Sequence, residues 1–134
     1  MREGWEAEYF AIPYRDGGRD HDGVDCYGLV VLVYREQFGV EIAPFEFVDR
    51  ETAGLQAIWS ADVESKWRRI ADHEVSAGDV VEIRLGDRPH CGIMLDGNRM
   101  LHARQAAGVS IEPISRGYWC RRVTGIYRHH LLME

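Results

Sequence analysis

The chain has 134 residues, of which 46% are hydrophobic and 28% charged, as expected for one globular domain covering residues 1–134. Its formal net charge of -6 argues against general nucleic-acid binding. No apolar stretch approaches the roughly 18 residues that a membrane span needs. The N-terminal MREGWEAEYFAIPYR lacks the apolar core of a secretory signal, so we expect synthesis in the cytoplasm without export by that route.

The N-terminal part contains a loop followed by a helix. Residues 16–25, DGGRDHDGVD, are dense in Gly and Asp and are typical of a loop. Asp25 is placed to cap a helix from about 26 to 38, in which apolar residues recur at helical spacing, and Gly39 is placed to end it. A second helical pattern covers about 50–64, although it includes two poor helix formers.

The C-terminal part changes to short runs that favour β-strands. Each run is bounded by Gly, Pro, Asp or Asn, which end strands and form turns. The expected strands cover 80–85, 91–95, 99–103, 109–114 and 123–128. Helices followed by strands predict an α+β fold in which N-terminal helices pack on an antiparallel β-sheet meander.

Three cysteines, Cys26, Cys91 and Cys120, are too widely spaced for a disulfide framework or a zinc-finger pattern, so we expect free thiols. Cys26 would be the first residue of the predicted helix, where unsatisfied backbone N–H groups lower a thiol pKa and favour the thiolate. The alternative is that Cys26 is a small buried apolar residue. We interpret Cys91 and Cys120 as packing residues.

Two histidines on successive expected strands are candidates for the base that a reactive thiol needs. His90 and His102 are separated by the turn signal Asp-Gly-Asn. If the loop is those three residues, Leu95 pairs with Arg99. His102 then lies opposite Gly92, and the two histidines are diagonal neighbours on one face of the sheet. A two-residue turn would shift the register by one and place them on opposite faces.

These residues would supply the parts of a nucleophilic hydrolase. Cys26 would be the nucleophile, one imidazole would take its proton, and the other polar group would orient that imidazole. For each histidine alone, the alternative is an exposed or hydrogen-bonded strand residue. A metal site is disfavoured because neither an H-x-x-x-H nor a C-x-x-C pair is present, so we expect no metal and no cofactor. The sets considered for a metal are the two hairpin histidines and the group His21, Asp22, Asp25 and Cys26.

Several short segments together resemble the NlpC/p60-type cell-wall peptidases, a papain-like family of cysteine peptidases. DGVDCYGLV resembles the family's D-C-x-G-L-V signature. GDVVEIRL, HCGIML and MLHA resemble its G-D-x-V-x-F, H-x-G-I and I-H-A segments, in the same order, and IPYRDGG resembles its P-Y-x-x-G-G approach. The resemblance covers about residues 10–128 and implies a papain-like NlpC-type domain.

The resemblance also implies a role for each matching residue. Cys26 matches the nucleophile, His90 the general base, and His102 the polar residue that orients this base. Tyr14 matches the tyrosine whose hydroxyl lies near the oxyanion site, where each donor contributes about 2.7–4 kcal/mol. The alternative for Tyr14 is an aromatic residue packed over the core. The implied activity is that of a peptidoglycan endopeptidase that cleaves stem-peptide amides.

Tyr27 departs from the free-standing cell-wall enzymes, which usually carry serine there. With an aromatic residue at this position, the chain resembles the subgroup found in phage tail assembly proteins. This resemblance implies cell-wall penetration at the tail tip of a virion or phage-like particle, with other tail-tip or hub proteins as partners. One alternative is a structural tail-tip or hub protein whose hydrolase activity is weak, gated or lost. Another is acyl transfer or amidase chemistry by the same residues.

Overall fold

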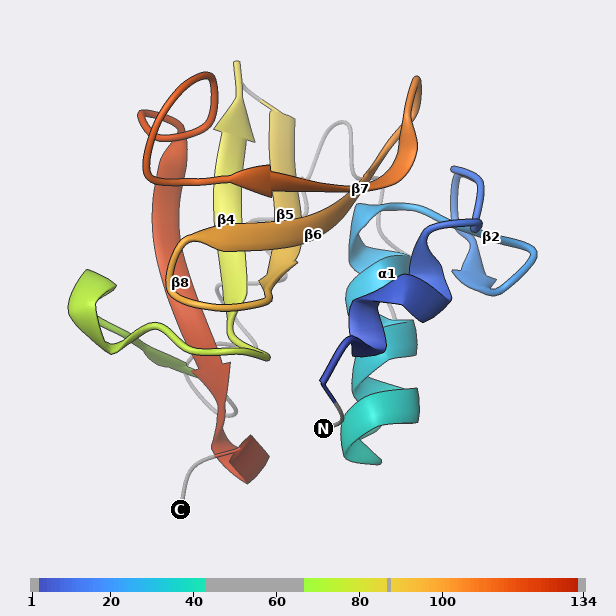
Figure 1. The fold of residues 1–134 in the computed structure, drawn as a ribbon, viewed down its shortest axis with the longest axis horizontal. Coiled ribbons are helices and arrows are strands. Elements are labelled where there is room, and N and C mark those ends of the chain that lie inside the picture. Colours follow the sequence, from blue (N-terminus) through green and yellow to red (C-terminus); the bar gives the residue numbers. More distant parts are fainter. Residues whose placement is uncertain (1–2, 43–66, 87, 133–134) are drawn as a thin grey trace.

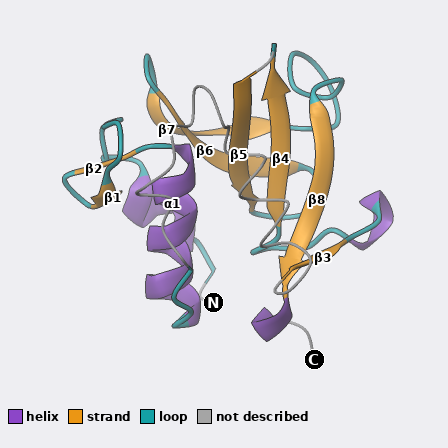
Figure 2. Ribbon diagram, turned by 180° about the vertical axis from the view of Figure 1, so that it is seen from behind, coloured by secondary structure: helices purple, strands orange, loops and turns teal. Residues whose placement is uncertain are grey.

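The computed structural model describes residues 3–42, 67–86 and 88–132, so the helix predicted over 50–64 lies outside the described residues. Within these ranges, α1 (Cys26–Val33) lies beside a six-stranded antiparallel sheet, which confirms the α+β class (Figures 1 and 2). The sheet order is β3-β8-β4-β5-β6-β7, and β1 and β2 form a separate ribbon. The strands are β1 (Arg19–Asp20), β2 (Gly23–Val24), β3 (Trp67–Arg69), β4 (Val80–Leu85), β5 (Arg88–Met94), β6 (Arg99–Arg104), β7 (Gly108–Pro113) and β8 (Val123–His129).

The helix begins and ends as its sequence predicts. The side chain of Asp25 caps the N-terminus by accepting a hydrogen bond from the Gly28 amide at 2.6 Å. After Val33 the chain continues as a π-helical turn, Tyr34–Phe38, and Gly39 ends it with a positive φ of 68°. All of α1 after its first residue is buried, because apolar residues cover the whole helix and both the sheet and the N-terminal segment pack on it.

The sheet contains the five predicted strands and one strand that the pattern missed. The expected 80–85 coincides with β4, whereas β5 starts three residues earlier than expected because Pro89 is tolerated near the start of the strand. The missed strand, β3, has only three residues. The arrangement also differs from a simple meander, because β8 returns to pair with β4 rather than extending the sheet beyond β7.

The two faces of the sheet carry separate apolar clusters. One face packs on α1 and includes Val80, Cys91, Ile93, Leu101 and Ala103. The other face holds a smaller cluster of Val81, Ile83, Met94, Met100, Trp119 and Ile126. Side chains alternate between faces along a strand. His90 and His102 therefore share the face that carries Trp119, while Cys91 faces the helix.

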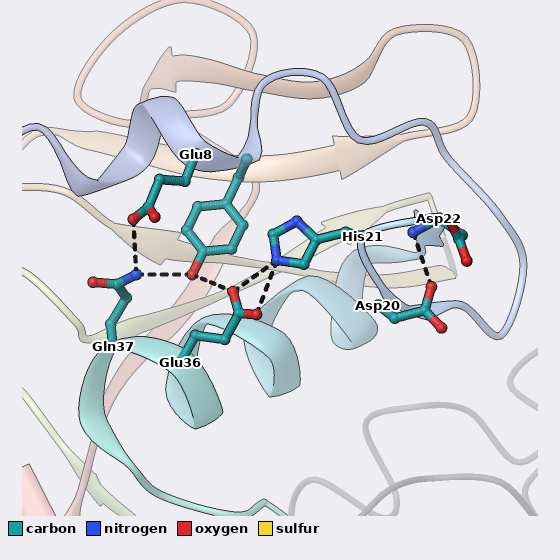
Figure 3. A network of polar contacts seen from close by, with 7 residues as sticks. Glu8, Asp20, His21, Asp22, Glu36 and Gln37 are labelled. Atoms are coloured by element: carbon teal, nitrogen blue, oxygen red, sulfur yellow. Dashed lines mark hydrogen bonds and ion pairs between the residues drawn. The ribbon is translucent and has the colours of Figure 1, made fainter.

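The N-terminal segment is attached to the π-helical turn that follows α1 by polar contacts (Figure 3). The hydroxyl of Tyr9, at the end of a short 3-10 helix (Trp5–Tyr9), donates to Glu36 at 3.0 Å. His21, in the turn between β1 and β2, lies 2.9 Å from both oxygens of the same carboxylate. Gln37 donates to Tyr9 and to Glu8. This network links the turn between β1 and β2 to the helical turn after α1 at the protein surface.

Candidate active site

Cys26 is the first residue of α1 and is held there by one buried carboxylate. Asp25 is 1% exposed, and besides capping α1 it accepts a hydrogen bond from the Gly17 amide at 2.9 Å. A Cβ added at Gly28 would lie 1.8 Å from the backbone oxygen of Gly18, so only glycine permits this approach of loop and helix. The start of the helix and the loop that precedes it therefore form one rigid unit around Cys26.

Tyr14 and Cys26 line the same cavity. Residue 14 runs beside Val24, and the backbone on either side of it is hydrogen-bonded to the Val24 amide and carbonyl. The cavity has a volume of about 310 Å³, and Cys26 is partly exposed in it. Its lining residues are Tyr14, Cys26, Leu85, Arg88, Pro89, His90, Ala103, Arg104, Gln105 and Ala106. Cys26 therefore borders the cavity rather than lying wholly within the core.

The hairpin β5–β6 has the register that places both histidines together. Leu95 donates its amide to the carbonyl of Arg99 at 2.8 Å, and Ile93 pairs with Leu101. The odd-length loop is therefore confirmed. His90 Nε2 lies 2.8 Å from His102 Nδ1, and the two ring centroids are 5.1 Å apart. A Cβ at Gly92 would approach the His102 side chain to 3.1 Å, so the glycine leaves space for this ring.

Two further residues surround the histidine pair, and neither was a candidate from the sequence. His102 Nε2 lies 2.8 Å from Glu112 Oε2 in β7. The buried Trp119 ring stacks on His90 at a centroid distance of 5.8 Å and meets His102 edge-on at 4.9 Å. The register of the second hairpin pairs Met100 with Glu112, which makes Glu112 a diagonal neighbour of His102. The same counting could have found Glu112, whereas no pattern indicates Trp119.

The surroundings of Cys26 favour its thiolate. Hydrogen bonding from the Cys91 thiol holds the pKa of Cys26 well below its ordinary value; hydrogen bonding and charge interaction with His90 act in the same direction, against the burial of the sulfur. The contact with Cys26 and burial both raise the pKa of Cys91. Cys91 therefore keeps its proton. It is buried on the core-facing side, as predicted, and it also stabilises charge on Cys26.

The second histidine has no exposed surface and is uncharged at neutral pH. Burial lowers the pKa of His102 from 6.5 to about 4, and the nearby charge of His90 adds to this effect, while the hydrogen bond to Glu112 opposes it. Burial acts to raise the pKa of Glu112, but the hydrogen bond with His102 and the ion pair with Arg104 outweigh it and hold that pKa below its usual value. The pair at neutral pH is thus a neutral imidazole and a carboxylate.

The structure brings all four predicted site residues to one place. Tyr14, Cys26 and His90 line the cavity, and His102 lies behind His90. Two residues of the group that was considered as a metal site have other contacts: His21 contacts Glu36, and Asp25 caps α1. Across residues 3–42, 67–86 and 88–132, no group of three or more His, Cys, Asp or Glu is arranged to hold a metal ion. A thiol beside an imidazole that is backed by a second polar ring can perform nucleophilic acyl chemistry.

Residues 11–128 match the NlpC/P60 family, and the chain belongs to that family. Over 117 residues, 87% of its length, it is 29% identical to the murein DD-endopeptidase MepS/murein LD-carboxypeptidase of Escherichia coli K12, and it spans 55% of that relative. It is 31% identical to the probable endopeptidase NlpC of the same organism, covering 83% of this chain and 65% of the relative. The chain thus spans about half to two thirds of these relatives.

The fold is similar to that of a solved NLP/P60-family protein from Staphylococcus aureus, described as similar to a lipoprotein. The TM-score is 0.66 at 26% identity, and the match covers 92% of this chain and 38% of the other. The α+β architecture is therefore that of the papain-like NlpC/P60 domain. No helix in the described part of the chain is long and apolar enough to cross a bilayer.

Proposed function

We propose that this protein is a cysteine endopeptidase that hydrolyses amide bonds in the stem peptides of peptidoglycan. The observation that carries the proposal is the meeting of Cys26 and His90 in an open cavity, with His102 behind His90. Membership of the NlpC/P60 family supports the hydrolase class, and the murein peptidase names of the relatives support the substrate. Those names include both an endopeptidase and a carboxypeptidase, so the cleaved bond is part of the proposal.

The reaction follows from the positions of these side chains. The Cys26 sulfur attacks the amide carbonyl carbon after its proton has moved to His90, and the carbonyl oxygen becomes an oxyanion. The backbone N–H of Cys26 and the Tyr14 hydroxyl are the proposed donors to this oxyanion. When the tetrahedral intermediate collapses, the C–N bond breaks and His90 returns the proton to the leaving amine. Water, deprotonated by His90, then hydrolyses the thioester and restores the thiol.

The charge of the cavity wall supports an acidic peptide substrate. Arg88 and Arg104 both line the cavity. Arg104 is already paired with Glu112 at 3.3 Å, whereas the exposed side chain of Arg88 makes no hydrogen bond or ion pair with any described residue. A free guanidinium suits a carboxylate of the stem peptide. Replacing Arg88 with alanine is expected to raise KM for stems with free carboxylates more than for amidated stems.

The decisive experiment compares two cysteine variants on purified sacculi. Cys26→Ala is expected to abolish the release of stem peptides, measured by mass spectrometry, which also identifies the cleaved bond. Cys120→Ala is the matched control, because Cys120 is a second partly exposed cysteine that does not line the cavity. The proposal fails if Cys26→Ala and the wild-type chain release the same peptides, or if neither releases any.

We further propose that the enzyme acts at the tail tip of a virion or phage-like particle, after synthesis in the bacterial cytoplasm. This rests on Tyr27, which stands where the free-standing cell-wall enzymes usually carry serine. In the structure Tyr27 is 1% exposed. The test is to purify particles from a producing strain and to search for this chain by mass spectrometry. Its absence from every particle fraction would contradict the tail-tip location and leave the peptidase proposal intact.

A further inference from the structure

The pair of hydrogen-bonded histidines, His90 and His102, contacts the carboxylate of Glu112 on its far side from Cys26. The Glu112 Oε2 atom lies 2.8 Å from His102 Nε2, and His102 Nδ1 lies 2.8 Å from His90 Nε2. Three side chains from three consecutive strands, β5, β6 and β7, are thus joined end to end. Cys26 and His90 line the same cavity, and His90 Nε2 is already occupied by His102, so Nδ1 is the ring nitrogen left for the thiol.

The direction of both hydrogen bonds, His90 to His102 and His102 to Glu112, follows from the charge of Glu112. An ionised carboxylate only accepts hydrogen bonds, so His102 must carry its proton on Nε2 in order to donate to Glu112. A neutral imidazole has one N–H, and His102 Nδ1 is then an acceptor. His90 must donate to it from Nε2. His90 Nδ1 is consequently left without a proton and can receive one from Cys26.

We propose that Glu112 is a positioning residue that sets the tautomers of both His102 and His90, so that His90 presents an unprotonated Nδ1 to the Cys26 thiol. This inference rests on the proposed cysteine hydrolase function. It adds a residue, outside the four predicted ones, on which proton transfer depends. Glu112 contacts neither the cavity nor the sulfur, so it acts only through the two rings.

The surroundings hold Glu112 ionised and in place. Arg104 lies 3.3 Å from the same carboxylate oxygen, and its guanidinium lies 5.5 Å from the centre of the Trp119 ring. The pKa of Glu112 is lowered despite its burial, and that of His102 is lowered to about 4, so a carboxylate faces a neutral imidazole at neutral pH. The side chain of His102 has no exposed surface, so water cannot supply a competing partner.

The same hydrogen bonds also stabilise the site after proton transfer, when His90 is a cation and Cys26 a thiolate. When the Cys26 proton moves to His90 Nδ1, the ring becomes an imidazolium whose Nε2–H already points to His102. No other proton has to move, and the Glu112 charge stabilises the cation through the polarised His102 ring. A glutamine at 112 loses this property, because its amide N–H₂ can donate to His102 Nε2 and reverse both tautomers.

The first test reads proton positions in the wild-type protein. With ¹⁵N-labelled histidine, long-range ¹H–¹⁵N correlation at a pH where both rings are neutral is expected to show protonated Nε2 and unprotonated Nδ1 for His90 and His102. A protonated Nδ1 on His102 would overturn the proposal. This spectrum needs neither a substrate nor a variant, so it separates failure of this inference from failure of the peptidase proposal.

The second test compares Glu112→Gln with Glu74→Gln, which removes one carboxylate from an exposed residue that does not line the cavity. Glu112→Gln is expected to lower kcat/KM about 10- to 100-fold, the range found when a residue that orients a metal-bound histidine is removed. It should also slow alkylation of Cys26 below neutral pH and alter the histidine tautomers, while Glu74→Gln matches the wild type. Unchanged tautomers and an unchanged pH profile of alkylation in folded Glu112→Gln would overturn the proposal, as these readouts do not respond to a merely structural role.

Discussion

Two histidine–glutamate pairs in this domain have nearly the same geometry and similarly exposed glutamates, 31% for Glu112 and 35% for Glu36, but they differ in the burial of the histidine. His102 Nε2 lies 2.8 Å from Glu112, and His21 Nε2 lies 2.9 Å from Glu36. The His102 side chain is 0% exposed, whereas the His21 side chain is 50% exposed. The distance alone therefore does not determine what such a pair does. Burial excludes water and allows one pair to fix proton positions, while the other is an ordinary surface contact.

The largest difference is expected in catalysis. His102→Ala should lower kcat/KM at least about 100-fold, because His90 loses the acceptor that fixes its tautomer, and a wrong histidine tautomer costs about 10⁴-fold in the Ser-His-Asp triad of serine proteases. His21→Ala should leave the rate close to that of the wild type. The measurement is hydrolysis of stem peptides, with circular dichroism to check folding. Equal losses in the two folded variants would refute the distinction between the pairs.

The pH dependence of stability should also distinguish the pairs. Above pH 6.5 His102 is neutral in the folded and unfolded chain and adds no pH dependence. Between 6.5 and the folded pKa of about 4, the unfolded chain binds a proton that the folded chain does not, so the free energy of unfolding falls as pH falls. The total loss in the free energy of unfolding from this one histidine is of order 3 kcal/mol. Urea unfolding at several pH values measures it.

Variants at the two histidines provide the control for that measurement. His102→Asn should remove this part of the acid destabilisation, and His21→Asn should retain it. If the His102→Asn protein lost stability between these pH values as steeply as the wild type, the lowered pKa of His102 would not be its cause.

The smallest effect is expected at the exposed pair. A double-mutant cycle on His21 and Glu36 should give a coupling energy of about 0.2–1 kcal/mol at a pH where His21 is charged, and high salt should reduce it. Thermal unfolding of the two single variants and the double variant measures this coupling. A coupling of several kcal/mol that is insensitive to salt would show that the exposed network resembles the buried one.

Local signals made much of the site predictable. The helix start at Cys26 follows from a capping aspartate, and the pairing of His90 with His102 follows from counting outward from one turn. Contacts made across the sheet were harder to predict. The return of β8 beside β4 depends on packing of residues far apart in the chain, and the thiol contact between Cys26 and Cys91 depends on how α1 lies on β5. The catalytic roles of Tyr14, Cys26, His90 and His102 stay predictions.

Asp25 has two opposing effects on the residue beside it. Its carboxylate organises the loop and the helix start, yet hydrogen bonding from Cys91 and His90 must lower the pKa of Cys26 against the negative charge of this neighbour. Thiol acidity and local order are therefore in conflict at this position. Loss of the Asp25 charge would favour the thiolate of Cys26, but it would also remove the hydrogen bonds to the Gly17 and Gly28 amides that hold the loop and the helix start around that thiol.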